Sequence, residues 1–458
     1  MRTTRLSDFV ATAAVVLSPA LMLSLKGGTG YCFFVVFMLS LLYLGRVEHR
    51  RSAAELYRKY RSLVFALLAL PCVVLFQILV LRTGTFPSLD PLLRLALVIP
   101  SFFFLASLPS RHLRRVQWGF VIGALGTGIW VFYQLAHPHV AYGIDRVGNT
   151  FTNPIPFGDT ALILGFLSMA SIRRSPDVTW LEVVVKAIAL VAGCYASYLS
   201  GARGGWIALP FLIWAAAGGR HWLVSLRARV VFGVVVLACI GALAGTSVVR
   251  ERVAAFGSDL TAMQRGDADT STGIRLNLWR ASTDLYLAHP VLGVGRGSLE
   301  RELRAKAERG EVQAVIVNGR AHSEFFSVLA EMGTVGVASL FFLYAGTFMP
   351  FWRNRTHPDP EIATASYLGL AMVGATVIFG LTIDVLTLVM NTAFFALTLA
   401  TLLAWIEARK RELAAADDAR SLGDRTGGQP EFEAERAGIA AEKASQFASR
   451  LPVHGNPH

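Results

Sequence analysis

Charged residues are scarce in this sequence. Of its 458 residues, 16% are Asp, Glu, Lys or Arg, whereas 54% are hydrophobic and the mean hydropathy is +0.50. Long stretches, such as 63–80 and 232–244, contain no charged residue at all. A soluble core cannot bury so many segments of this kind, which excludes a soluble globular protein. The composition instead predicts an all-α polytopic membrane protein.

Cysteine is also rare, and strand-like patterns are missing. The four cysteines, Cys32, Cys72, Cys194 and Cys239, all fall inside apolar runs. That placement predicts small buried side chains and excludes both a disulfide framework and a CxxC metal pair. Ten-residue segments of alternating hydrophobicity are absent, and lipid favours helices, which satisfy their own backbone groups. The net charge of +12 lies in short arginine clusters between apolar runs, which argues against a nucleic-acid partner.

Apolar windows of roughly 20 residues predict about 12 transmembrane helices. The first apolar segment has no convincing cleavage site and is expected to be retained as a helix. The linkers alternate between arginine-rich and arginine-poor, and the positive-inside rule places the arginine-rich set and both termini in the cytoplasm. The expected spans lie near 8–25, 30–47, 62–81, 91–108, 115–135, 157–171, 180–200, 204–218, 229–248, 322–351, 362–383 and 386–407.

One connection is much longer and more polar than the others. It predicts a helical cap on the non-cytoplasmic face, between the ninth and tenth spans. Ser271 or Thr272 begins its first helix, the GVGRG stretch forms a turn, and Ser298 begins a second helix. The predicted organisation is therefore spans 1–9 in 1–248, the cap in 249–321, spans 10–12 in 322–407, and a partly disordered cytoplasmic tail in 408–458.

Five arginines fall on the side of the membrane where positive charge is normally scarce. Guanidinium groups hold phosphate oxygens in a bidentate fork, so these arginines predict binding of a lipid-linked diphosphate. In SGARGGW the glycines around the arginine are expected to let a large anion approach the backbone. Ordinary anchoring at the lipid interface is the alternative for each of them. The five are Arg82, Arg94, Arg146, Arg203 and Arg275.

His322 begins the tenth expected span. The helix dipole and the neighbouring Arg320 disfavour the imidazolium form there, and a neutral imidazole can act as a general base. Gly333 lies about 20° from His322 around an ideal helix and is expected to let another helix pack beneath it. The alternative is a histidine that bonds a loop carbonyl. Glu331, on the opposite face, is expected to bond neighbouring helices rather than carry protons.

A metal site is a weaker possibility. His137 and His139 have metal-binding side chains, and Asp145 or Asp159 can supplement them. The intervening Pro138 and the loose spacing make this a weak signal, and no metal or cofactor is expected.

Several motifs together resemble the O-antigen ligase/polymerase superfamily. They are SGARGGW, STGIRLNLW, AHPVLGVGRGS and HSEFFSVLAEMG, in this order, around a large insert. The resemblance covers residues 149–405 and is greatest to the O-antigen ligases of Gram-negative bacteria. The ligase pattern of arginine, three residues and leucine is not reproduced, because Ile207 follows Arg203 and Trp279 follows Arg275 at that spacing.

The resemblance implies an inverting glycosyltransferase of the inner membrane, with its site facing the periplasm and the insert forming a periplasmic cap. The donor would be a glycan on undecaprenyl diphosphate and the acceptor lipid A–core. The family's histidine maps onto His322 and its two important arginines onto Arg203 and Arg275; Asp384 and Glu324 are supporting candidates. A polymerase of the same superfamily and, less favoured, a secondary transporter remain the alternatives.

Overall fold

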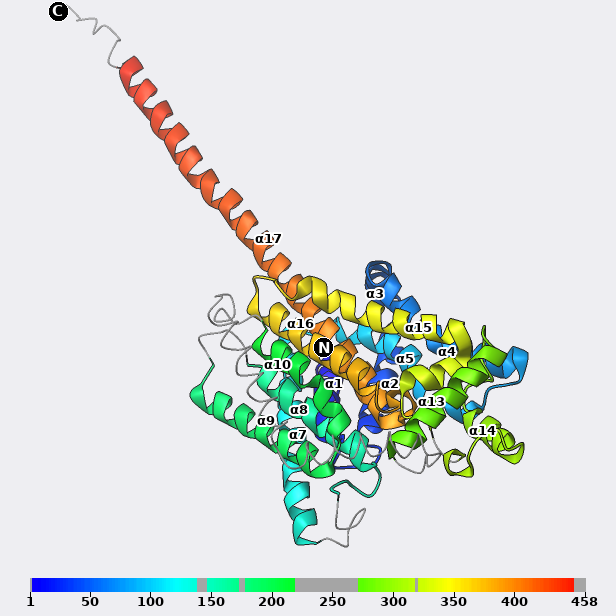
Figure 1. The fold of residues 1–458 in the computed structure, drawn as a ribbon. Coiled ribbons are helices and arrows are strands. Elements are labelled where there is room, and N and C mark those ends of the chain that lie inside the picture. Colours follow the sequence, from blue (N-terminus) through cyan, green and yellow to red (C-terminus); the bar gives the residue numbers. More distant parts are fainter. Residues whose placement is uncertain (1, 138–145, 173–177, 219–270, 318–319, 449–458) are drawn as a thin grey trace, which may run out of the picture. The chain divides into compact units, whose positions relative to one another are not determined.

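The computed structural model describes residues 2–137, 146–172, 178–218, 271–317 and 320–448. In this part every regular element is helical, apart from an isolated bridge between Asn149 and Thr152 (Figure 1). The all-α prediction is therefore confirmed. The chain forms two units, 1–408 and 409–458.

Seven helices of the described residues are long and apolar enough to cross a membrane, and a bent pair makes an eighth. The chain is accordingly a multi-pass membrane protein. Two further helices are apolar but shorter, in Leu6–Ala20 and Pro154–Ala170. The seven are Arg61–Leu81, Phe86–Leu105, Ser110–Ala136, Trp180–Ser200, Glu324–Asn354, Pro360–Phe379 and Val389–Ser421.

The described residues, with seven or eight such helices, do not confirm the expected twelve spans. The eighth expected span, 204–218, is a 3₁₀ turn followed by a nine-residue helix, α10 (Leu209–Ala217), which is too short to cross about 30 Å of hydrocarbon. The expected ninth span, 229–248, lies outside the described residues. The tail was expected to be partly disordered; α17 (Val389–Ala448) carries the last apolar run and continues as a helix into it.

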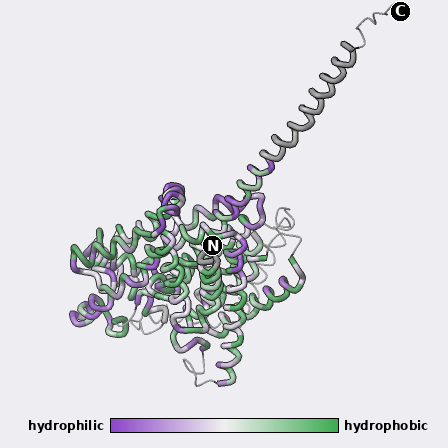
Figure 2. Tube along the Cα trace, turned by 180° about the vertical axis from the view of Figure 1, so that it is seen from behind, coloured by the Kyte–Doolittle hydropathy of each residue, from purple (hydrophilic) through white to green (hydrophobic). Residues whose placement is uncertain are grey.

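The N-terminal part of unit 1 contains α1 to α7. The arginine-rich stretch after α2 is itself a helix, α3, which meets α2 at 112°. It stands out as hydrophilic among mostly hydrophobic helices (Figure 2). The elements are α1 (Arg2–Ala20), α2 (Gly28–Leu44), α3 (Val47–Lys59), α4 (Arg61–Phe76) with the π turn η1 (Gln77–Leu81), α5 (Phe86–Leu105), α6 (Ser110–Leu113) and α7 (Val116–Ala136).

The centre of unit 1 is formed by α8 (Pro154–Ala170), α16 (Pro360–Phe379) and the first part of α17. These helices are apolar on nearly every side because neighbouring helices surround them, and Trp405 is fully buried. Around them lie α9 (Trp180–Ser200), the 3₁₀ turn η3 (Arg203–Ala208) and α10. At one end of the bundle, Glu361 accepts hydrogen bonds from Arg114 at 2.9 Å and Trp405 at 3.0 Å.

The insert forms two helices, as expected, at the start of α15 (Glu324–Asn354). They are α13 (Ser271–Ala288) and α14 (Leu299–Glu308), and Ser298 occupies the N-cap position of α14, although its side chain does not cap it. Both lie beside α15 (Figure 1) and pack onto it. The packing is through one small apolar cluster. The cluster includes Leu278, Leu285, Leu299, Leu303, Ile316 and Ala330.

Candidate functional site

His322 lies immediately before α15 rather than inside it. Its φ of 50° is a left-handed conformation that few non-glycine residues adopt, and the helix begins two residues later at Glu324. The helix start is fastened by Glu324, whose N–H donates to the carbonyl of Gly380 at 2.7 Å. On the other side, Trp279 donates from Nε1 to the carbonyl of Ala321 at 2.9 Å. These anchors hold His322 between α13 and the end of α16.

The expected role of Gly333 is wrong. Because His322 is not helical, the 20° relation between the two residues does not exist, and Gly333 itself breaks the helix with φ 61° and ψ −157°. A Cβ there would collide with the backbone of Val291 and Leu292. The N–H of Thr334 donates to the carbonyl of Pro290 at 2.8 Å. Gly333 therefore seats the loop after α13 on α15, not another helix under the histidine.

The GVGRG stretch is a turn, as expected, but its arginine was overlooked. Gly293, Gly295 and Gly297 all have positive φ. They let the loop approach α15 closely enough for backbone hydrogen bonds, for example from the N–H of Gly295 to the carbonyl of Glu331 at 2.9 Å. The loop thereby carries Arg296 into the interior, where 2% of the residue is exposed.

Arg296 forms two buried ion pairs. Its guanidinium lies 3.1 Å from a carboxylate oxygen of Glu324 and 3.1 Å from one of Glu331. Glu331 also accepts hydrogen bonds from the N–H groups of Gly297 and Leu299, at 3.0 and 3.3 Å. Glu331 thus bonds neighbouring elements, as expected. No residue spacing distinguished Arg296 in the sequence, since its partners are 28 and 35 residues away.

Glu324 and Asp384 were both supporting candidates, and the structure gives them different hydrogen-bond partners. One oxygen of Glu324 binds Arg296, and the other accepts from the N–H of Leu386 at 2.8 Å. Asp384 is buried and accepts a hydrogen bond from Ser327 at 2.7 Å. Its charge also acts on His322. Glu324 is therefore part of the framework, whereas the negative charge of Asp384 acts both on His322 and on Arg296.

Arg275 and Arg146 meet near His322. Arg275 is half-buried on α13, and its pKa is lowered by burial and then by the nearby charge of Arg146. Arg146 donates to the carbonyl oxygens of Ser200 and Gly201, at 3.0 and 3.2 Å, and so caps the end of α9. The structure therefore brings the end of α9 and the insert helix to one place.

Arg203 leaves the same helix end. Its side chain is exposed at the start of η3, and its N–H donates to the carbonyl of Gly201 at 3.0 Å. The expectation for the glycines beside it is wrong, because protein already fills the space of the Cβ atoms that they lack. A Cβ on Gly201 would meet Arg146, one on Gly204 would meet Thr382, and one on Gly205 would meet Asp159. These glycines pack η3 against its neighbours.

The remaining two arginines have different surroundings. Arg82 is exposed at the end of η1, again with positive φ, beside the loop that contains Ser298. Arg94 is buried in α5, is paired with Asp90 at 2.9 Å and lies over the ring of Phe34. Its charge is therefore largely balanced within its own helix.

The pKa of His322 is lowered from its ordinary value. Burial is the largest cause, the charges of Arg275 and Arg320 act in the same direction, and the charge of Asp384 opposes them. The imidazole is therefore neutral over a wider pH range than a free histidine. A neutral imidazole near a carboxylate can accept a proton and then be stabilised as imidazolium.

A pocket of about 310 Å³ is lined by Arg320, which precedes His322 closely in the chain, although His322 and Arg275 do not line it. Arg320 donates to the hydroxyl of Thr387 at 2.6 Å. Asp384 and the loop that carries Arg296 form other parts of the wall, and the first turn of α5 closes it through Pro87 and Ser88. The pocket thus joins four segments that are far apart in the sequence.

The weak metal signal gains no partners in the part of the chain that the structure describes, where no group of three or more His, Cys, Asp or Glu side chains is arranged to hold a metal ion. His139 and Asp145 lie outside the described residues. His137 is exposed and stacks on Tyr133. Asp159 is buried beside Gly205 in the helix bundle.

The arrangement defines a multi-pass membrane protein with a polar site at the ends of its helices. The site contains several arginines and His322, whose pKa is lowered. The O-antigen ligase family model matches residues 188–342, which include Arg203, Arg275, Arg296 and His322. The chain is also similar to an uncharacterized protein of Haemophilus influenzae, with 20% identity over 358 residues that cover 76% of this chain and 86% of the relative. The match to the family model supports membership of the O-antigen ligase superfamily.

Proposed function

We propose that the protein is an O-antigen ligase, an inverting glycosyltransferase that moves a glycan from undecaprenyl diphosphate to lipid A–core. The observation that carries this proposal is the electrostatic environment of His322, on which the charge of Arg275 acts, while the charge of Arg146 acts on Arg275. Cations for a diphosphate and a base for a hydroxyl thus lie next to each other. These are the two components that transfer from a lipid diphosphate requires.

The arginines bind the donor's diphosphate. Arg275 lies on α13, Arg146 and Arg203 lie at the end of α9, and Arg82 ends η1. Arginine forks suit phosphate oxygens, and an anion bound between two cations relieves their mutual repulsion. Arg94 was a fifth candidate; its pairing with Asp90 makes it the weakest of the set.

The reaction balances without an added reductant, oxidant or nucleotide. The acceptor hydroxyl oxygen forms a bond to C1 of the donor sugar, from the face opposite the diphosphate. The C1–O bond to phosphate breaks, and the electron pair leaves with undecaprenyl diphosphate, whose charge the arginines neutralise. The hydroxyl proton passes to His322, and Asp384 stabilises the resulting imidazolium. Arginines serve here in place of a divalent cation, so the proposed mechanism is metal-independent.

The proposed location follows from the substrates and from the positive-inside rule. The protein spans the bacterial inner membrane with both termini in the cytoplasm, and α13 and α14 form part of a periplasmic cap. The site then faces the periplasm, where the lipid-linked donor can reach it from the membrane. Membrane lipid, donor and acceptor are its partners, and no nucleic acid is involved.

The decisive experiment is transfer in vitro with purified full-length protein. Undecaprenyl-diphosphate glycan and lipid A–core are supplied to wild type and to His322→Ala, and the product is resolved by mass. The variant is expected to lose about 10²–10⁴-fold in rate, as for removal of a general base. Retention of the folded state is checked by thermal unfolding. A folded variant with undiminished transfer would refute the role of His322, and a wild type without ligation would refute the ligase assignment.

A polymerase of the same superfamily is the second candidate. It is favoured by one observation, the absence of the leucine expected after each arginine and three intervening residues: Ile207 and Trp279 occupy those positions. The chemistry would be the same, with a second lipid-linked glycan as acceptor. An assay with donor alone distinguishes the two, because a polymerase lengthens the glycan without lipid A–core.

A further inference from the structure

Each end of α5 lines a different pocket. The first turn contributes Pro87 and Ser88 to the pocket lined by Arg320, and the far end contributes Phe104 to a second pocket of about 410 Å³. The helix has 20 residues, so the two ends are roughly 30 Å apart, which equals the thickness of the hydrocarbon core. The second pocket therefore lies at the opposite membrane surface from the proposed reaction site.

The walls of the second pocket differ in polarity. Leu39 and Leu42 on α2, Phe104 on α5 and Leu108 after it form an apolar side, and Leu42 is 72% exposed. An apolar side chain this exposed on a spanning helix faces lipid. One side of the pocket is thus continuous with the acyl-chain region of the bilayer.

The opposite side of the pocket is polar and carries both signs of charge. Arg46 and His49 contribute from the sharp junction of α2 and α3, and the ring of His49 stacks on Tyr43 at 4.1 Å. Asp8 contributes from α1; its carboxylate accepts a hydrogen bond from Ser7 at 3.5 Å and keeps capacity for a further donor. Arg50 strengthens the junction by donating to the carbonyl of Leu44 at 3.1 Å.

We propose that this pocket binds one phospholipid whose headgroup carries a primary amine, such as phosphatidylethanolamine. The phosphate lies at Arg46 and His49, the ammonium donates to Asp8, and an acyl chain lies along Leu39, Leu42 and Phe104. The phosphate and the ammonium of the headgroup then each lie near a side chain of opposite charge, and the acyl chain lies against apolar side chains. A purely anionic headgroup would leave Asp8 facing negative charge, and choline has no N–H to donate to it.

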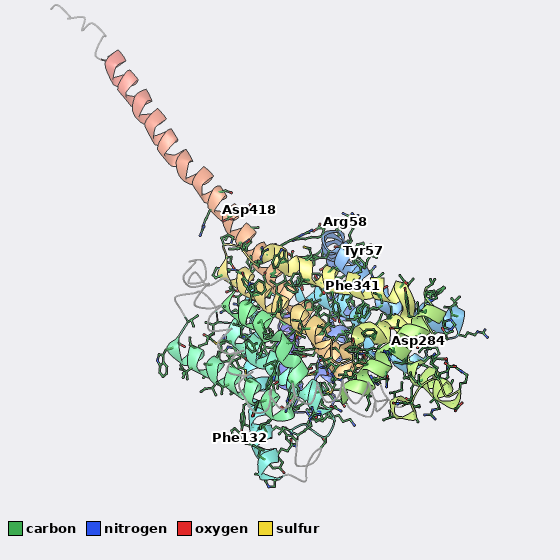
Figure 3. All side chains as sticks on the ribbon, in the orientation of Figure 1. Tyr57, Arg58, Phe132, Asp284, Phe341 and Asp418 are labelled. Carbon is green, nitrogen blue, oxygen red and sulfur yellow. The ribbon has the colours of Figure 1, made fainter. Side chains whose placement is uncertain are left out.

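The outer side of α3 offers a matched control. Arg51 and Arg58 are exposed on the same helix but do not line the pocket. Arg58 and its neighbour Tyr57 lie at the periphery of the molecule (Figure 3). Replacement of Arg51 and Arg58 removes positive charge from the same surface without touching the pocket, so it measures the general attraction to lipid headgroups alone.

The test is native mass spectrometry of the full-length protein in detergent, titrated separately with phosphatidylethanolamine, phosphatidylglycerol, phosphatidylcholine and inorganic phosphate. Wild type is expected to retain one phosphatidylethanolamine in preference to the others. Arg46→Gln with His49→Gln is expected to weaken retention about fivefold or more, as for loss of a cation at a lipid surface. Arg51→Gln with Arg58→Gln is expected to have little effect.

Two further variants separate the headgroup from the cavity. Asp8→Asn is expected to shift the preference from phosphatidylethanolamine towards phosphatidylglycerol, which a purely structural role for Asp8 would not do. Leu39→Trp fills the apolar side and is expected to reduce retention of every phospholipid without altering charge. Thermal unfolding establishes that each variant is folded.

Several results would overturn the proposal. They are equal retention of phosphatidylglycerol or phosphatidylcholine by wild type, equal loss in the Arg51 and Arg58 control, an unchanged preference in Asp8→Asn, and displacement of the lipid by inorganic phosphate. Equal loss in the control would indicate general attraction, and displacement would indicate a site for free phosphate.

Discussion

Arg296 and Glu324 form an ion pair at 3.1 Å in which each side chain is 2% exposed. The arginine belongs to the loop between the two insert helices, and the glutamate begins the helix that follows His322. The pair therefore fastens the insert to the segment that positions the histidine. Glu331, one and a half to two turns further along α15, binds the same guanidinium. The geometry of the site depends on charges that substrate does not need to touch.

Removal of Arg296 is expected to destabilise the protein strongly. Arg296→Met leaves Glu324 and Glu331 buried without a cation, which costs about 3–5 kcal/mol. The measurement is the apparent melting temperature in detergent. Arg304→Gln is the control, because its pair with Glu300 is exposed and such pairs contribute about 0–1 kcal/mol. Addition of Glu324→Gln and Glu331→Gln to Arg296→Met should recover part of the loss. An Arg296 variant as stable as the control would contradict the role given to this cluster.

The pH dependence of transfer is expected to report His322. Burial and the charges of Arg275 and Arg320 lower its pKa, so the active neutral form persists below the pH at which a free histidine would be protonated. The rate should therefore fall only as the pH drops through this lowered pKa. In Arg275→Gln the pKa rises towards its ordinary value, and the acidic limb of kcat/KM should move to higher pH.

The control for this prediction lies on the same helix. Arg280 is exposed on α13, so Arg280→Gln should leave the acidic limb where it is in wild type. If the limb keeps its position in Arg275→Gln while the rate changes, His322 is not the group that titrates.

Substitution of Gly333 is expected to disturb the packing of the insert. Gly333→Ala places a Cβ against the backbone of Val291 and Leu292 in addition to straining a φ of 61°. Gly310→Ala separates the two effects, because Gly310 also has positive φ, 74°, and nothing lies within 4 Å of its Cβ position. Gly310→Ala should cost about 1–3 kcal/mol of backbone strain alone. Gly333→Ala should lower the melting temperature further, and equal shifts would contradict the close packing of this loop.

Arg203 is expected to act on donor binding. Its side chain is exposed just after the end of α9, so Arg203→Gln removes the proposed phosphate ligand without leaving a buried charge unpaired. The KM for the donor should rise about tenfold, as for loss of a charge-assisted hydrogen bond of 1.5–3 kcal/mol. Arg203→Lys should recover only part of it, because an ammonium lacks the fork. Donor kinetics at saturating acceptor measure this, and an unchanged KM would remove Arg203 from the donor site.

Much of the candidate site was predictable because its signals are local. SGARGGW, the insert helices and the start of α15 are each read from a few neighbouring residues, and they led to Arg203, Arg275 and His322. The burial of Arg296 and the packing of Gly333 against the loop after α13 were not predictable in this way. Each depends on contacts between residues that are far apart in the chain, such as Gln77, whose side chain accepts from the N–H of Arg296 at 3.1 Å.

The sequence by itself determined that the protein is helical and lies in a membrane, because long apolar segments have no other way to satisfy their backbone in lipid. It also determined which arginines and which histidine are candidates. Only the tertiary structure decided that His322 precedes its helix, that three glycines next to Arg203 pack against protein, and that Arg296 is buried between two carboxylates. Burial and electrostatic environment arise from long-range packing, and no local pattern of residues records them.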